Sequence, residues 1–380
     1  MANANIDFLI KVRPHLLAEY AAHHKITYST KFTEAGDQVA DELIQLVQRS
    51  DEDIQSAFFV NICDIDEVGT GNGCEYLARR VQSLGHKIDE KLYEELENAK
   101  ERALYFYLHW YDVFSEIHQQ YAVDNLRGWR GVKTHSKSIS EIRENIPSFE
   151  EGLKVLYKQD YKGNNLKIKW FEKGDRAVFI AYIEDALTSD TSFNKGHLNT
   201  KTPRRPVFSV FFSYRSREGI LEVKADGGKQ RIQELQKIFI AKMLKEEPIL
   251  KDAIRYDFEK IQDLEQLKFP TEIEDEIISV TLRGLRIVDH AMQVTFNIDI
   301  GNLPGTGTEP MVDTLKEKHI NLKYYRVTQF KLEVLFDNHG KGPQRKVTTA
   351  ISSPNICDLK ERPIDNVVRR LLKKWEIDLF

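Results

Sequence analysis

Residues 207–243, VFSVFFSYRSREGILEVKADGGKQRIQELQKIFIAKM, predict two strands, a tight turn and a helix in direct succession. Apolar, aromatic and β-branched residues recur with the two-residue period of a strand in 207–214 and again in 220–225. A short segment that ends in glycine separates them, which is typical of a hairpin turn. After the glycine pair 227–228, apolar residues recur at three- and four-residue steps. We therefore expect an antiparallel hairpin followed by an amphipathic helix.

Strand-like and helix-like periodicities also recur in the rest of the C-terminal two thirds. Two strands, a connection, two more strands and a helix occur twice in succession, so we hypothesise an internal duplication of a ββββα unit. The other expected strands are 166–171, 177–183, 277–288, 292–300, 325–336 and 347–352, and the other expected helices are 249–267, 311–318 and 364–375.

The N-terminal third is predicted to be entirely helical. Its longest expected helix covers 88–121, where apolar residues keep to one face over roughly eight turns. The second half of that helix is aromatic almost all round, and a helix that is apolar on every side is buried on every side. We therefore expect it to contact another domain or a protein partner, including a second copy of the chain. The residues expected to make this contact are Tyr107, Trp110, Tyr111 and Phe114.

These patterns predict an α+β protein: an all-helical domain followed by antiparallel sheets with packed helices. Two closely spaced glycines, Gly128 and Gly131, end the helical region and indicate a linker. The expected divisions are an acidic helical domain (1–126), a basic linker and helix (127–166), an α+β domain with basic loops (167–270) and a second α+β domain that ends in a helix (271–380).

Charge is segregated along the chain, although the total is only −4. Residues 1–126 carry 11 Lys+Arg against 22 Asp+Glu, whereas residues 127–245 carry 24 against 14. The remaining residues carry 20 against 23. Such asymmetry indicates either a contact with DNA or RNA or two oppositely charged parts that neutralise each other.

The basic residues of the middle third lie in segments that also contain glycine, proline or turn residues, where flexible cations can follow a phosphate backbone. Trp129, between two arginines, is expected to stack on a base. Charge reversal at Arg127, Arg130, Arg204 and Arg205 is expected to weaken binding. The full set of candidate nucleic-acid-binding residues is Arg127, Trp129, Arg130, Lys133, Lys137, Lys201, Arg204, Arg205, Arg215, Arg217, Lys229 and Arg231.

Glu222 and Lys224 are weak catalytic candidates. Side chains alternate along a strand, so Glu222-Val223-Lys224 places an acid and a base on one face. The segment resembles the Glu-x-Lys motif of restriction-endonuclease-type nucleases, which implies hydrolysis with Mg²⁺ or Mn²⁺. However, the preceding strand ends in Phe212-Ser213-Tyr214-Arg215, without the aspartate of that family. The alternative is an ordinary surface pair of a strand.

No other constellation indicates an enzyme. The eleven histidines and three cysteines show no metal-site spacing, and neither a long apolar span nor a signal peptide is visible. We therefore expect no cofactor, no membrane and a cytoplasmic location. Our leading hypothesis is a non-catalytic nucleic-acid-binding or adaptor subunit, for example in bacterial defence against phage. A metal-dependent nuclease and a purely structural assembly subunit are the alternatives.

Overall fold

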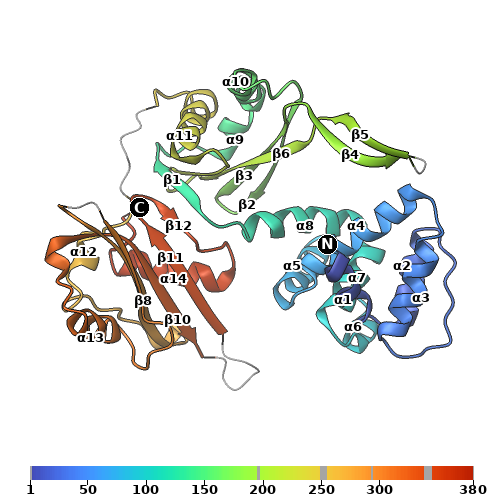
Figure 1. Ribbon diagram of the computed structural model, residues 1–380, viewed down its shortest axis with the longest axis horizontal. Coiled ribbons are helices and arrows are strands. Elements are labelled where there is room, and N and C mark those ends of the chain that lie inside the picture. The colour runs from blue at the N-terminus through green and yellow to red at the C-terminus, as the bar shows by residue number, and fades with distance from the viewer. Residues whose placement is uncertain (1, 195–196, 249–254, 292–293, 338–344, 380) are drawn as a thin grey trace. The chain divides into compact units, whose positions relative to one another are not determined.

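The computed structural model describes residues 2–194, 197–248, 255–291, 294–337 and 345–379. The chain divides into two compact units, residues 1–125 and 126–380 (Figure 1). Each unit is described by itself. None of the helices in the described ranges combines the length and the apolar character needed to cross a membrane.

The first unit is all helical, and its helices enclose one hydrophobic core. Its helices are α1 (Ala2–Leu9), α2 (Pro14–His23), α3 (Asp37–Val47), α4 (Glu52–Val68), α5 (Gly71–Ser83), α6 (Glu90–Glu95), α7 (Ala99–His109) and α8 (Tyr111–Asp124).

The expected helix 88–121 is wrong, because the chain turns twice within it. The first break lies between α6 and α7. Asn98 ends it as the N-cap of α7, because its side chain accepts hydrogen bonds from the backbone N–H groups of Lys100 and Glu101. At Trp110 the backbone leaves the helical region (φ −141°, ψ 60°), which separates α7 from α8. The two helices therefore fold back within the unit, and the aromatic residues meet there instead of at an outer surface.

Three of the four expected contact residues are covered as a result. Tyr107 and Phe114 are each only 2% exposed, and their rings meet at 5.3 Å in the core of the unit. Trp110 is partly buried against the same core. Tyr111 is 50% exposed. The aromatic pattern reflects a folded core rather than a docking surface.

The second unit contains a ten-stranded antiparallel sheet with the order β2-β3-β6-β7-β1-β12-β11-β10-β8-β9. Its strands are β1 (Trp129–Lys133), β2 (Leu166–Lys173), β3 (Arg176–Glu184), β6 (Val207–Arg215), β7 (Ile220–Lys224), β8 (Ile277–Asp289), β9 (Thr295–Asp299), β10 (Tyr325–Phe336), β11 (Arg345–Ser352) and β12 (Ile356–Cys357). A separate two-stranded hairpin, β4 (Thr188–Asn194) and β5 (His197–Arg204), lies between β3 and β6 along the chain and was not among the expected strands.

Residues 129–133, expected to belong to a linker, form β1 in the middle of this sheet. β1 pairs with β7 on one side and with the short β12 on the other. It therefore joins the strands from residues 166–224 to those from residues 277–357. The two expected α+β domains, 167–270 and 271–380, share one sheet.

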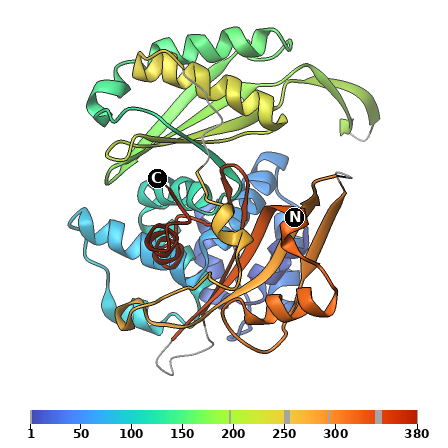
Figure 2. The ribbon, with the colours of Figure 1, turned by 90° about the vertical axis from the view of Figure 1, so that its left-hand side faces the viewer.

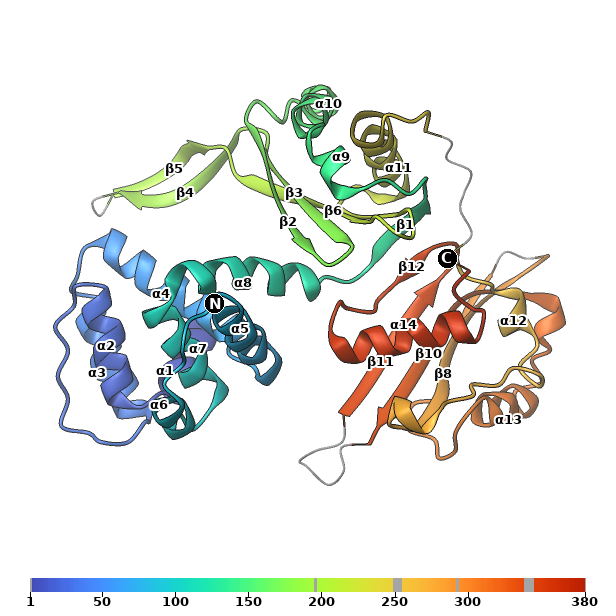
Figure 3. The same ribbon diagram turned by 180° about the vertical axis from the view of Figure 1, so that it is seen from behind.

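Helices cover the sheet differently in its two halves. In the first half, α10 (Ile146–Lys158) and α11 (Gly228–Phe239) lie side by side on one face, and their apolar side chains form a core with the strands (Figure 2). In the second half, α14 (Pro363–Lys374) lies across β10 and β11 (Figure 3) and contributes to a second core. The remaining helical segments are α9 (Ile139–Arg143), α12 (Glu259–Gln262), α13 (Glu309–Glu317), the π-helical turn η1 (Ile240–Leu244) and the 3₁₀ turns η2 (Ile273–Asp275) and η3 (Leu322–Tyr324).

The two halves share four strands followed by a helix, but their strand order differs. In the first half the strands follow the chain across the sheet, as β2, β3, β6 and β7. In the second half β9 lies outside β8, so the outer two strands are reversed. The succession of elements is similar in the two halves, apart from the short β12 before α14, but the strand order in the sheet does not repeat. Of the expected helix 249–267, residues 249–254 lie outside the described residues, and only α12 is α-helical in the rest.

Candidate functional site

Glu222 and Lys224 lie on the same face of β7, but the Glu222 carboxylate is enclosed. Glu222 is 2% exposed. Its Oε1 accepts a hydrogen bond of 2.6 Å from Nη1 of Arg255, and its Oε2 lies 3.7 Å from Nε of Arg215. Both carboxylate oxygens therefore face guanidinium groups.

Glu222 belongs to a buried charge cluster, which we define as Arg215, Glu222, Arg255, Glu361, Arg369 and Asp378. Arg255 also holds Asp378, with 3.0 Å between Nη2 and Oδ2. Glu361 accepts from Arg215 at 2.6 Å and lies 3.1 Å from Nη2 of Arg369. Three guanidiniums thus neutralise three carboxylates, as buried charges require.

The cluster keeps Glu222 ionised. Burial alone raises the pKa of a carboxyl group, because it disfavours the charged form. In Glu222 the positive charges of Arg255, Arg215 and Arg369 outweigh burial and hold the pKa well below its ordinary value. A carboxylate of this kind is a poor proton acceptor at neutral pH.

Gly131 in β1 makes room for the cluster. It pairs with Glu222 across the ladder. A Cβ atom at this position would lie 3.2 Å from Nη1 of Arg255 and 3.6 Å from Cγ of Glu222. The glycine that indicated a linker therefore allows the Arg255 guanidinium to approach the strand.

The surroundings of Glu222 do not favour the nuclease interpretation. A divalent cation needs several converging oxygen ligands with free lone pairs. Both oxygens of Glu222 are occupied by arginines. In the parts of the chain that the structure describes, no three His, Cys, Asp or Glu side chains converge as metal ligands would. Glu222 is a structural residue.

Replacing Arg255 tests this role. Arg255→Ala leaves Glu222 and Asp378 buried without their main counter-charge, and breaking a buried pair in this way costs about 3–5 kcal/mol. The free energy of unfolding, measured by guanidinium titration, should fall by that amount. Lys374→Ala removes the exposed pair with Glu272 and should change it by less than about 1 kcal/mol. Equal losses in the two variants would contradict the structural role.

The structure divides the predicted nucleic-acid-binding residues into exposed and internal groups. The exposed residues are Arg127, Lys133, Lys201, Arg204, Arg205, Arg217 and Lys229, and the partly or fully buried ones are Trp129, Arg130, Lys137, Arg215 and Arg231.

Trp129 and three of the cations have structural contacts. Trp129 is 3% exposed and lies under the guanidinium of Arg176, 5.9 Å from its ring centroid, so the ring is not available to stack on a base. Arg215 belongs to the buried charge cluster. Arg231 contacts Asp160 at 2.5 Å, and Lys137 donates to the carbonyl of Leu244. These residues stabilise the fold.

A set of residues that sequence reasoning missed lies on the face of β2, β3, β6 and β7 opposite α10 and α11. We call it the lysine face and define it as Lys167, Lys169, Phe171, Lys173, Tyr182, Phe211 and Lys224. The strand register places Lys167 beside Tyr182 and Lys169 in line with Phe211 and Lys224. The Nζ of Lys169 lies 5.7 Å from the ring centroid of Tyr182, which confirms that the two side chains share a face.

Cations and aromatic rings lie close together on this surface, with the buried Val178 and Ile180 of β3 between them. Lys167 and Lys169 are exposed, while Phe171, Tyr182 and Phe211 are partly exposed. Three acids bear on the face: Glu222 is held by Arg255, Glu184 lies 3.9 Å from Arg205, and Asp358 interacts electrostatically with Lys224. The sequence did contain a signal, because lysines at every second position of an expected strand point to one side.

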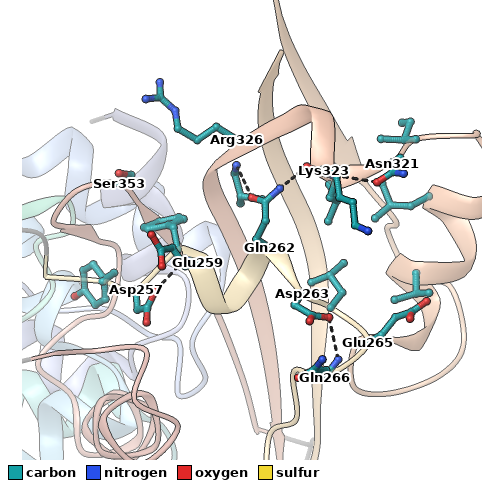
Figure 4. Close-up of a pocket in the computed structure, with 18 of the residues that line it drawn as sticks. Asp257, Glu259, Gln262, Asp263, Glu265, Gln266, Asn321, Lys323, Arg326 and Ser353 are labelled. Carbon is teal, nitrogen blue, oxygen red and sulfur yellow. Dashed lines mark hydrogen bonds between the residues drawn. The ribbon is translucent and has the colours of Figure 1, made fainter. Parts of the chain in front are cut away.

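A groove of about 1480 Å³ lies in the second half, between residues 257–266 and residues 312–327 (Figure 4). Gln262 bridges its two walls by donating to the carbonyl oxygen of Tyr325 at 2.7 Å. Its acids support the local backbone: Asp257 accepts from the N–H of Glu259 and Asp263 from that of Gln266. The groove contains none of the predicted site residues, and Asp257, Gln262 and Asp263 support its walls.

Comparison with known proteins adds no family to this description. No protein-family model matches the sequence, and no curated protein matches it significantly. The candidate sites therefore rest on the residues of this chain alone.

Proposed function

We propose that this protein binds single-stranded nucleic acid on the lysine face. The observation that carries the proposal is that lysines and aromatic rings share one face of an antiparallel sheet. Single strands are held in this way by proteins that combine cations for the phosphates with aromatic side chains for the bases. Stacking tolerates any base, since every base has a π-face.

The strand register gives the binding surface its layout. Lys169 and Lys224 mark the two sides of one row, with the buried Ile180 and the partly exposed Phe211 between them. Lys167 and Tyr182 form the neighbouring row. A single strand that crosses β2, β3 and β6 would meet a cation or a ring on each of these strands. The helices α10 and α11 support the sheet from its other face.

Three of the cations predicted from the sequence lie outside the lysine face and are exposed. Lys201 and Arg204 are exposed on β5, and Arg205 follows directly before β6. Their contribution is sequence-independent attraction to phosphate, which salt weakens because binding releases counterions. We retain these residues as secondary contacts and omit Trp129 and Arg215, which are internal.

Charge reversal on the lysine face should weaken nucleic-acid binding and make the binding constant less dependent on salt concentration. In fluorescence anisotropy with a labelled single-stranded oligonucleotide, Lys167→Glu with Lys169→Glu should weaken binding at least tenfold at low salt. Losing two phosphate contacts should reduce the slope of log K against log salt by about 1.4. The matched control is Lys318→Glu with Lys323→Glu, which changes the charge equally in the second half. Binding that does not depend on salt, or that both pairs weaken equally, would count against the proposal.

Tyr182 tests the stacking contribution separately from charge. Stacking of a base on an aromatic ring contributes about 1–3 kcal/mol, so Tyr182→Ala should weaken single-strand binding about fivefold or more. Tyr182→Phe keeps the ring and should bind as the wild type does. An unlabelled duplex of the same length should compete poorly, because its bases are not free to stack. Equal affinities of the Ala and Phe variants would remove Tyr182 from the site.

A further inference from the structure

β9 is the outermost strand of the second half, and its outer edge is open. It pairs with β8 on one side, and no strand among the described residues pairs with its other side. Val294 and Phe296 are 45% and 40% exposed at this edge. Thr295, Asn297 and Asp299 are exposed as well. An uncovered edge of this kind is a template for pairing with another strand.

The ladder identifies which backbone groups are free to pair. The N–H of Asp289 donates to the carbonyl of Val294, and the N–H of Ile300 donates to the carbonyl of Arg283. Val294 and Ile300 therefore turn their backbone groups toward β8, as do the even-numbered residues between them, because the direction alternates along a strand. The N–H and C=O groups of Thr295, Asn297 and Asp299 consequently point outward.

The two edges of the sheet differ in their protection. At the opposite edge, β2 carries Lys167, Lys169 and Lys173, and charged residues of this kind prevent edge-to-edge association. The single charged residue of β9 is Asp299, whose carboxylate accepts a hydrogen bond from Lys331 at 2.8 Å. The β9 edge thus lacks the repulsive charges that guard the β2 edge.

We propose that β9 pairs with β9 of a second copy of this chain, in antiparallel register centred on Asn297. A two-fold axis perpendicular to the sheet continues each face of the sheet into the same face of the second copy. The side chains of paired residues must therefore lie on the same face. In this register Phe296 meets Ile298 of the second copy on the face of the second core. Asn297 meets Asn297, and Thr295 meets Asp299, which brings no like charges together.

This register uses the backbone N–H and C=O groups of β9 that point away from β8. Asn297 exchanges both backbone hydrogen bonds with its equivalent, and Thr295 does so with Asp299 of the second copy. The pairing spans the five residues of β9, which is short for an interface. Stable interfaces bury roughly 1,200–2,000 Å². We therefore expect a reversible dimer that forms at micromolar concentrations and above. The pairing does not depend on the proposed nucleic-acid binding.

Site-specific crosslinking tests the register. In a full-length Cys63→Ser background, Asn297→Cys should form an intermolecular disulfide under mild oxidation, because the paired Cα atoms would lie about 5.5 Å apart. Thr295→Cys is the matched control: the two copies of residue 295 would be offset by about 13 Å along the strands, so no crosslink should form. A crosslink in both variants, or in neither, would overturn the proposal.

Sedimentation over a concentration series tests the dimer without cysteines. Asn297→Pro removes an N–H that points away from β8, so the fold should be kept while the central pairing is lost. It should reduce association at least tenfold, with an unchanged circular dichroism spectrum. Asn297→Thr keeps the N–H and should associate as the wild type does. A wild-type protein that stays monomeric at several hundred micromolar, or a proline variant that dimerises equally well, would refute the pairing.

Discussion

The guanidinium of Arg255 lies between two buried carboxylates, Glu222 and Asp378, and the architecture of residues 126–380 depends on this contact. The three residues come from a connecting segment, from β7 and from the C-terminal end, so one side chain ties together distant parts of the chain. Removing any member leaves an uncompensated buried charge, which is far more costly than a lost surface pair. The cluster thus joins two hydrophobic cores that otherwise share few elements.

The buried charge cluster also decides how the charge of the middle third is used. Part of the positive surplus of residues 127–245 is neutralised inside the fold, because Arg215 pairs with Glu361 from the C-terminal third. That partner was not anticipated, since charge sums indicated either an external polyanion or the acidic helical region. In the same cluster, the Glu222 carboxylate serves to neutralise buried arginines. The cations that remain exposed, Lys167 and Lys169 above all, lie beside aromatic rings, which is why binding of a single strand is the function we propose.

Periodicity alone predicted much of the fold. The strands on both sides of residues 215–219 and the helix after Gly227 and Gly228 occur as expected, because hairpins and the helices that follow them depend on local residues. The α+β class and the helical N-terminal third follow from the same local signals. The lysine face was also accessible in principle, from the alternation of lysines in β2.

The errors share a long-range cause. β1 is five residues long and contains a glycine, so it resembled a linker, although the glycine admits the Arg255 side chain from a segment far along the chain. The expected helix 88–121 continued the helical period through residues where the chain turns back on itself. Trp129 was interpreted from its neighbours in sequence, whereas Arg176 covers it. No local pattern reports such partners.

Hydrogen–deuterium exchange across a guanidinium series is the most direct measure of whether the buried charge cluster unites the two halves of the sheet. If it does, amides in β3 and β6 should open with the same free energy as those in β10 and β11, because the halves unfold together. Two distinct opening free energies, one for each half, would show that the cluster joins two independently stable domains, and would contradict the central role given to Arg255.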